Sequence, residues 1–208
     1  LTAILITHTH ADHISGLQTL LKRCAAPVFT TERAARELSW RLPGAETRLD
    51  ALDFGIPQSI GEFAVTAFPT SHDAPGSCGF RLDAAGGAVG VLTDTGYVTD
   101  EAADILEGVD LAVLEANHDI ETLRSGPYPY YLKQRILGAQ GHLSNEDAAR
   151  FAAVLAQSGT SEIILAHLSR ENNTPAMAQT AVERALSAAG VSPLLSVAPR
   201  DCLGPAHT

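Results

Sequence analysis

The sequence has few aromatic residues and no long apolar run. Aromatic residues make up 5% of the 208 positions, while hydrophobic residues make up 45%, which is enough to bury one sizeable core. No stretch of about 18 apolar residues could span a bilayer. The chain also does not begin with the charged and apolar regions of a signal peptide. We therefore expect a soluble, cytoplasmic protein without a membrane partner.

Cysteine is scarce as well. The three cysteines, Cys24, Cys78 and Cys202, lie far apart and are odd in number. This argues against a disulfide framework and against a cysteine-based zinc site. We expect all three to be buried as small apolar side chains.

Positive charge is the third deficit. Acidic residues outnumber basic ones by 24 to 14, and the formal net charge is −10. This argues against a surface coated with positive charge that binds nucleic acid of any sequence, although a local basic track is compatible with this composition. Two bound divalent cations would offset part of the negative charge at the place where an anionic substrate would meet them.

Hydrophobic periodicity predicts alternating strands and helices around a β-rich middle block at 50–94. Strands are expected at 3–7, 27–30, 62–68, 78–82, 88–92, 110–115, 162–166 and 194–197. Helices are expected at 14–24, 32–40, 145–157 and 176–189. Gly86-Gly87 is expected as a hairpin turn, and the stretch 124–140 as a partly exposed loop and helix. Such a pattern favours sheets covered by helices on their outer sides.

Four residues of metal-ligating type lie within six positions near the chain start. They are His8, His10, Asp12 and His13. They follow the predicted strand 3–7, and side chains at the C-terminal end of a buried strand can converge on one pocket. A solvated histidine-rich loop is the alternative, but four such residues after an apolar strand favour a metal site. Imidazole and carboxylate ligands suit zinc, manganese or iron, so the metal stays open.

This pattern, His-x-His-x-Asp-His, resembles the metallo-β-lactamase superfamily. The resemblance implies an α/β fold, the four-layer αββα sandwich, and further ligands in a fixed order. Matching residues follow three more predicted strands: His72 in Ser-His-Asp, Asp94 in Thr-Asp-Thr-Gly, and His167 in Leu-Ala-His-Leu-Ser. Singly, such residues are more often turn or satisfied polar residues. Their shared position after strands makes the set convincing.

The resemblance also assigns the ligands to two divalent ions. His8, His10 and His72 would hold one ion, and Asp12, His13 and His167 the other, with Asp94 bridging both. Two ions about 3.5–4 Å apart can deprotonate a bridging water near neutral pH, and the resulting hydroxide would be the nucleophile. No serine or cysteine nucleophile with a partnered base stands out in the sequence.

Two later motifs resemble those of ribonuclease Z-like enzymes. They are Leu114-Glu115-Ala116-Asn117-His118-Asp119 and Gly141-His142-Leu143-Ser144. We expect His142 to act as general acid or phosphate contact, oriented by Glu115, because an imidazole can deliver a proton near neutral pH. With Asp12 and Asp94, these two complete the expected catalytic residues. Packing or capping of the next helix is the alternative for His142.

Other polar residues near these motifs have simpler interpretations. Ser144 with Asp147 looks like a capping box for the helix at 145–157, and capping is preferred there over phosphate binding. His118 and His207 have no partner in the pattern and are interpreted as structural or surface residues.

The segment Arg170-Glu171-Asn172-Asn173, with the motifs around His72 and His142, resembles the YycJ/WalJ branch, bacterial proteins related to DNA exonucleases and to the ribonuclease Z and J nucleases. This resemblance covers nearly the whole chain. It implies a phosphodiesterase acting on nucleic acid, as a 5′-to-3′ DNA exonuclease. The basic residues and tyrosines considered as nucleic acid contacts are Arg124, Tyr128, Tyr130, Tyr131, Lys133, Arg135 and Arg170. A mixed, solvated surface explains them equally well.

Two other functions remain open. A hydrolase of a small thioester, lactone or cyclic ester would show a narrow pocket, and a non-catalytic regulatory module would use the fold only to bind metal. The chain opens at Leu1 with a strand leading at once into the first motif. We therefore expect one hydrolase domain, 1–208, that lacks its N-terminal strands. The preference between DNA and RNA, the direction of digestion and the oligomeric state stay open from the residues alone.

Overall fold

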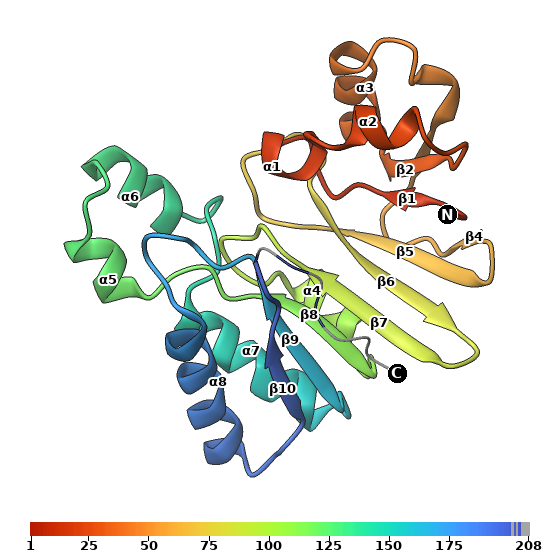
Figure 1. Cartoon of the computed structure of the whole chain (residues 1–208). Helices are drawn as coiled ribbons and strands as arrows, with labels where there is room; N and C mark the ends of the chain where they lie inside the picture. Colours follow the sequence, from red (N-terminus) through yellow and green to blue (C-terminus); the bar gives the residue numbers. More distant parts are fainter. Residues whose placement is uncertain (201, 203, 205–208) are drawn as a thin grey trace.

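The structure is a computed structural model that describes residues 1–200, 202 and 204. The described strands form two sheets, with helices on the outer side of each (Figure 1). The smaller sheet consists of parallel strands in the order β1 (Ile4–Leu5), β2 (Val28–Thr31) and β3 (Leu49–Leu52). The larger sheet has the order β10 (Leu194–Val197), β9 (Glu162–Ala166), β8 (Leu111–Glu115), β7 (Gly87–Leu92), β6 (Cys78–Ala84), β5 (Phe63–Pro69) and β4 (Gln58–Ile60).

The described helices fall into three groups along the chain. The first comprises α1 (Ala11–Ile14), α2 (Leu17–Leu21), α3 (Glu32–Arg41) and the 3-10 helix η1 (Glu46–Arg48). The second comprises α4 (Asp100–Leu106), α5 (Ile120–Ser125) and α6 (Tyr130–Leu137). The third comprises α7 (Asn145–Gln157) and α8 (Pro175–Ala189). None of these helices is long and apolar enough to cross a membrane, within the part of the chain that the structure describes.

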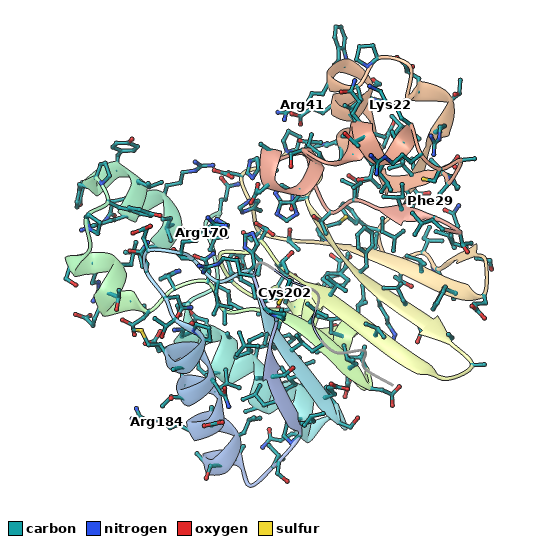
Figure 2. All side chains as sticks on the ribbon, in the orientation of Figure 1. Lys22, Phe29, Arg41, Arg170, Arg184 and Cys202 are labelled. Carbon is teal, nitrogen blue, oxygen red and sulfur yellow. The ribbon has the colours of Figure 1, made fainter. Side chains whose placement is uncertain are left out.

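Three clusters of buried apolar side chains separate four layers. One cluster lies between the larger sheet and α4, α7 and α8, and includes Leu114 and Phe151. A second lies between the two sheets and includes Phe29 of β2, labelled in Figure 2, and Phe80 of β6. The third joins the smaller sheet to α1, α2 and α3 through Leu38 and its neighbours. The αββα order expected from the sequence is confirmed.

Strand directions bring several chain segments to one edge of the larger sheet. Strands β5 and β7 both pair antiparallel with β6, so they run in the same direction. Strands β8 and β9 run parallel to β7. The carboxyl ends of β5, β7, β8 and β9 therefore meet at one edge, the position where α/β sheets commonly bind ligands.

Most predicted elements agree with the structure, and the differences have local causes. The hairpin between β6 and β7 is confirmed, but its turn residues are Ala85 and Gly86, one position earlier than predicted, and Gly87 begins β7 at a φ of 137°. The helix expected at 14–24 is wrong in its bounds: α1 begins at Ala11, and α2 begins only after Gly16, a residue that weakens helices. Helices α4 and α5 are too short to give a clear periodic signal. The predicted burial of the free cysteines holds for Cys78 but is wrong for the exposed Cys202, and Cys24 is only partly buried.

Candidate metal centre

The seven predicted ligands lie together at one end of the sandwich. They are His8, His10, Asp12, His13, His72, Asp94 and His167. The last three follow β5, β7 and β9, whose carboxyl ends meet at this edge. His8 and His10 follow β1, while Asp12 and His13 lie on α1. Both sheets therefore contribute side chains to one place, as the strand-end pattern predicted.

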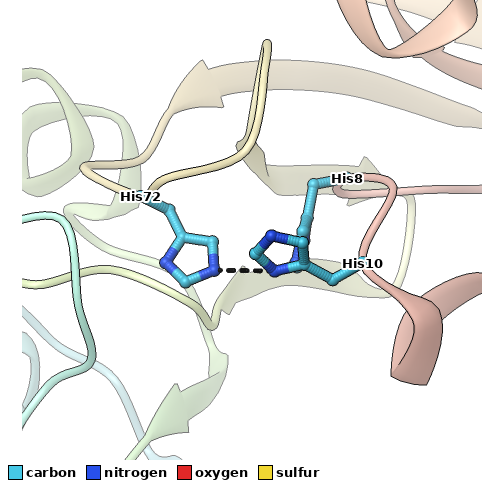
Figure 3. A group of neighbouring side chains, drawn as sticks. All are labelled: His8, His10 and His72. Carbon is cyan, nitrogen blue, oxygen red and sulfur yellow. Dashed lines mark hydrogen bonds between the residues drawn. The ribbon is translucent and has the colours of Figure 1, made fainter. Parts of the chain in front are cut away.

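The first group of ligating atoms consists of ring nitrogens of His8, His10 and His72, all within 4.8 Å of one another. Nδ1 of His10 lies 3.2 Å from Nε2 of His72, which approaches from the other side of the site (Figure 3). His8 is fully buried. Burial lowers the pKa of His8 to about 3, since the loss of solvation outweighs the attraction of Asp94. His8 is therefore neutral near pH 7, the form in which histidine binds metal.

The second group consists of Asp12, His13 and His167, whose ligating atoms also lie within 4.8 Å of one another. Oδ2 of Asp12 lies 3.7 Å from Nε2 of His13 and 3.6 Å from Nε2 of His167. The side chain of Asp12 is 65% exposed, whereas that of His13 is 18% exposed. Asp12 thus brings this second group close to solvent, and the group could hold a second cation.

Asp94 lies between the two groups. Its Oδ1 is 3.7 Å from Nε2 of His72 and 3.6 Å from Nε2 of His167, and its Oδ2 is 3.3 Å from Nε2 of His13. Burial acts to raise the pKa of Asp94, but the nearby imidazoles of His13 and His167 outweigh it and lower that pKa. The carboxylate stays ionised at neutral pH and faces both groups, as a bridging ligand must.

The donor atoms fit divalent cations. Nε2 of His8, Nε2 of His13 and Oδ2 of Asp94 are buried without a hydrogen-bond partner among the described residues. An unpaired buried polar atom costs about 1–3 kcal/mol, and coordination of a cation would remove that cost. Asp94 and His167 also both have a φ of 58°, the left-handed region that non-glycine residues rarely adopt. Nitrogen and oxygen donors of this kind suit zinc, manganese or iron.

Thr7 orients one histidine from each group. Its hydroxyl Oγ1 lies 3.1 Å from Nδ1 of His8 and 3.2 Å from Nδ1 of His13. With the Nδ1 atoms engaged there, the Nε2 atoms of both rings are left for a cation. Partners of this type fix the tautomer and the ring orientation of metal-binding histidines.

Glu115 contacts His142, as its motif predicted, and it also contacts His167. Oε1 of Glu115 lies 2.8 Å from Nδ1 of His142 and 2.9 Å from Nδ1 of His167. Burial opposes the charged form of all three groups. The mutual hydrogen bonds nevertheless lower the pKa of Glu115, raise that of His142, and raise that of His167 to about 9. One buried carboxylate thus orients both histidines.

A cleft of about 480 Å³ opens over these residues. Of the side chains considered as nucleic acid contacts, Tyr128, Arg135 and Arg170 line it. Nε of Arg135 donates a hydrogen bond of 2.6 Å to Oδ2 of Asp73, which neutralises part of its charge. The cleft also exposes Asp12 and His142, so a substrate can reach the centre.

The remaining candidate contacts lie outside this cleft within the described structure. Tyr130 and Tyr131 are 77% and 74% exposed. Nζ of Lys133 donates to the backbone carbonyl of Arg124, and the guanidinium of Arg124 pairs with Glu121. The mixed, solvated surface is the better explanation for these four side chains.

Residues 1–168 match a family profile described as a beta-lactamase superfamily domain. The chain belongs to this superfamily. It is 36% identical to "Exodeoxyribonuclease YycJ" of Bacillus anthracis, over 91% of the chain and 72% of the relative. It is 39% identical to "Exodeoxyribonuclease WalJ" of Streptococcus pneumoniae strain D39, over 91% of the chain and 71% of the relative. The resemblance to this branch is therefore confirmed.

Two solved structures show the same fold. The metallo-beta-lactamase fold protein YhfI from Bacillus subtilis matches with a TM-score of 0.72 and 20% identity, over 94% of this chain and 74% of that one. Zinc-bound PqqB from Methylobacterium extorquens matches with a TM-score of 0.67 and 18% identity, over 94% and 70% of the two chains. The chain belongs to the beta-lactamase superfamily and brings together a cluster of metal-ligating residues. It is therefore a metal-dependent hydrolase.

The sequence did not predict a set of hydrogen-bonded asparagines next to the candidate metal centre. Nδ2 of Asn145 donates to Oδ1 of Asn173 at 3.0 Å, and Nδ2 of Asn173 donates to the carbonyl of Ala116 at 2.8 Å. Nδ2 of Asn117 donates to the carbonyl of His167 at 2.9 Å. These bonds join the segments that carry Glu115, His142 and His167. The Asn172-Asn173 pair, already notable in the branch motif, was the one available signal.

The two histidines without a predicted role differ in what the structure describes. His118 is 1% exposed, so its structural interpretation fits and its surface interpretation is wrong. Both ring nitrogens of His118 lack a hydrogen-bond partner among the described residues. His207 lies outside the described residues. The hydroxyl of Ser144 accepts from the backbone N–H of Asp147 at 3.1 Å, which confirms Ser144 as the cap of α7.

Proposed function

We propose that the chain is a dinuclear-metal phosphodiesterase that degrades DNA as a 5′-to-3′ exonuclease. The strongest support is its 36–39% identity to relatives named exodeoxyribonucleases, over 91% of the chain. The direction of digestion follows the resemblance to the nuclease branch. Because one centre draws ligands from His8 to His167, we also propose that residues 1–208 form a single hydrolase domain.

Seven side chains would hold the two ions. His8, His10 and His72 would bind one, Asp12, His13 and His167 the other, and Asp94 both. Zinc or manganese fits these ligands, and iron is compatible. When bound, such a pair activates water and neutralises charge on the phosphoryl oxygens.

His142 and Glu115 supply the remaining chemistry. His142 lines the cleft, and its Nδ1 is held by Glu115 at 2.8 Å. This contact leaves the other ring nitrogen for the substrate and favours the protonated ring. His142 would thus donate a proton to the leaving oxygen, or a hydrogen bond to the phosphoryl group.

DNA cleavage by the metal-loaded protein tests this function. The substrates are 5′-phosphorylated single- and double-stranded DNA, each with phosphorothioate linkages at either the 5′ or the 3′ end. We expect release of mononucleotides. Phosphorothioate linkages at the 5′ end should block this release, and the His8→Ala and Asp94→Ala variants should show none. No cleavage by the parent protein would overturn the proposal, as would cleavage that survives both substitutions. If phosphorothioate linkages at the 3′ end blocked the release instead, digestion would run from 3′ to 5′ and the proposed direction would be wrong.

A small-ester hydrolase is the second candidate function. It is favoured by the net charge of −10 and by a cleft of about 480 Å³, a size suited to small molecules. Hydrolysis of a thioester or lactone by a preparation that leaves DNA intact would select this candidate. Metal binding without either activity would instead indicate a regulatory module.

A further inference from the structure

One wall of the cleft is apolar and is not explained by packing of the fold. Tyr128, Leu132 and Ile136 line the cleft and are each half-buried. None of them belongs to the apolar clusters of the described residues. Leu132 and Ile136 are four positions apart on α6, so they share one helical face. Tyr128 extends this face from the turn before the helix. Apolar side chains that face a cleft in this way indicate a ligand surface.

The wall is fixed relative to the metal centre. Nζ of Lys133 donates to the carbonyls of Arg124 and Gly126, each at 2.7 Å, which ties α6 to the end of α5. At the other end, Oγ of Ser71 donates to the carbonyl of Ala139 at 2.7 Å. The ion pair of Arg135 with Asp73, next to His72, adds a further link. A surface held in place before the ligand arrives loses little entropy on binding.

Tyr128 is suited to contact a flat ligand. Its ring has neither a hydrogen bond nor an aromatic contact among the described residues. Arg170, on the loop after β9, lines the same cleft (Figure 2). A ligand there would touch an aromatic and aliphatic wall on one side and the metal-ligating residues at the floor. A nucleotide has both required parts, a planar base and a phosphate.

We propose that Tyr128, Leu132 and Ile136 form a nucleobase subsite, which holds the terminal nucleotide of a DNA strand beside the metal centre. This subsite rests on the proposed exonuclease function and specifies how that function selects strand ends. A cleft of about 480 Å³ has room for about one nucleotide. A base enters it only after leaving the stack of its neighbours, which costs least at a strand end.

The test combines removal of the Tyr128 ring from the protein with removal of the terminal base from the DNA substrate. Release of the first product is measured for the parent, Tyr128→Ala, Tyr128→Phe and Tyr131→Ala proteins. Each protein is given DNA with an intact terminal nucleotide or with an abasic tetrahydrofuran analogue there. Tyr131 is the matched control, because it is a tyrosine three positions away, at the start of α6, but is 74% exposed and does not line the cleft.

Base stacking predicts a loss of about five- to 150-fold in kcat/KM for Tyr128→Ala on intact DNA. The abasic substrate should suffer a similar loss with the parent protein, and the two losses should not add. Tyr128→Phe should retain most activity, because the ring is kept, and Tyr131→Ala should match the parent. Losses that add, or an unchanged Tyr128→Ala rate, would overturn the subsite while leaving the exonuclease function intact.

A binding measurement separates failure of the subsite from failure of the proposed function. Calorimetry would compare thymidine 5′-monophosphate with 2-deoxyribose 5-phosphate on the metal-loaded parent and Tyr128→Ala proteins. Tighter binding of the nucleotide, lost in Tyr128→Ala, supports the subsite even if DNA is not cleaved. Equal binding of both ligands by the parent protein overturns it.

Discussion

Oε1 of Glu115 lies 2.8 Å from Nδ1 of His142. The other carboxylate oxygen, Oε2, accepts backbone N–H groups of Thr95 and Leu143, each at 3.1 Å. Thr95 follows Asp94 directly, and Leu143 follows His142. The buried carboxylate therefore joins the turn after β7 to the segment before α7, and it sets the orientation of His142 within that frame.

Replacing Glu115 by glutamine should damage the centre. A glutamine must direct its amide NH₂ either at two imidazole N–H groups or at two backbone N–H groups, so one pair of hydrogen bonds is lost. We expect activity to fall by about 10–100-fold or more and the free energy of unfolding to fall by roughly 1–3 kcal/mol. Steady-state kinetics and urea unfolding would measure both. Glu121→Gln, at a side chain that is 81% exposed, is the control; equal behaviour of the two variants would contradict the role of Glu115.

Thr7→Val should weaken metal binding, because it keeps the shape of the side chain but removes the hydroxyl that contacts His8 and His13. Loss of such a partner lowers metal affinity by about 10–100-fold. Competition with a chromophoric chelator would measure the affinity, and Thr7→Ser should restore it. Thr30→Val is a matched control, since the buried hydroxyl of Thr30 has no hydrogen-bond partner in the described structure. Unchanged affinity in Thr7→Val would show that the hydroxyl does not orient the ligands.

Asn145 and Asn173 should act as a unit. Alanine at either position breaks the amide pair that joins the start of α7 to the segment before α8, and each change should lower the free energy of unfolding by about 1–3 kcal/mol. The double variant should lose less than the sum, with a coupling of about 0.5–3 kcal/mol. Both single variants should also bind metal more weakly, since Asn173 and Asn117 support the segment of His167. Additive losses with unaltered metal affinity would refute the coupling.

His118 should make the metal-free protein sensitive to acid. Burial lowers the pKa of His118 to about 4, against about 6.5 in an unfolded chain. The unfolded state then binds more protons, so stability is complete above about pH 6.5 and falls as the pH drops toward 4. The loss approaches about 3 kcal/mol. Urea unfolding with chelator present, at pH 7 and pH 5, should show a smaller loss for His118→Phe than for the parent. Equal losses would exclude His118 as the cause.

The grouping of the seven predicted ligands could be expected because their motifs come after apolar strands whose ends meet at one edge, and because these motifs resemble those of the superfamily. The contact between Asn145 and Asn173 could not be predicted, since the two residues are 28 positions apart and only tertiary packing brings them together. Helix α6 was ambiguous because its apolar residues face the cleft rather than a core. Thr7 gave no signal, since its contacts with His8 and His13 depend on the turn between β1 and α1.

The number of metal equivalents needed for DNA cleavage tests the central claim most directly. Metal-free protein at a concentration well above its metal dissociation constants would be titrated with manganese or zinc while cleavage of 5′-phosphorylated DNA is followed. Seven ligands in two groups bridged by Asp94 predict activity that rises to a break at two equivalents per chain. Full activity at one equivalent, activity in the metal-free protein, or no activity at any loading would contradict the account.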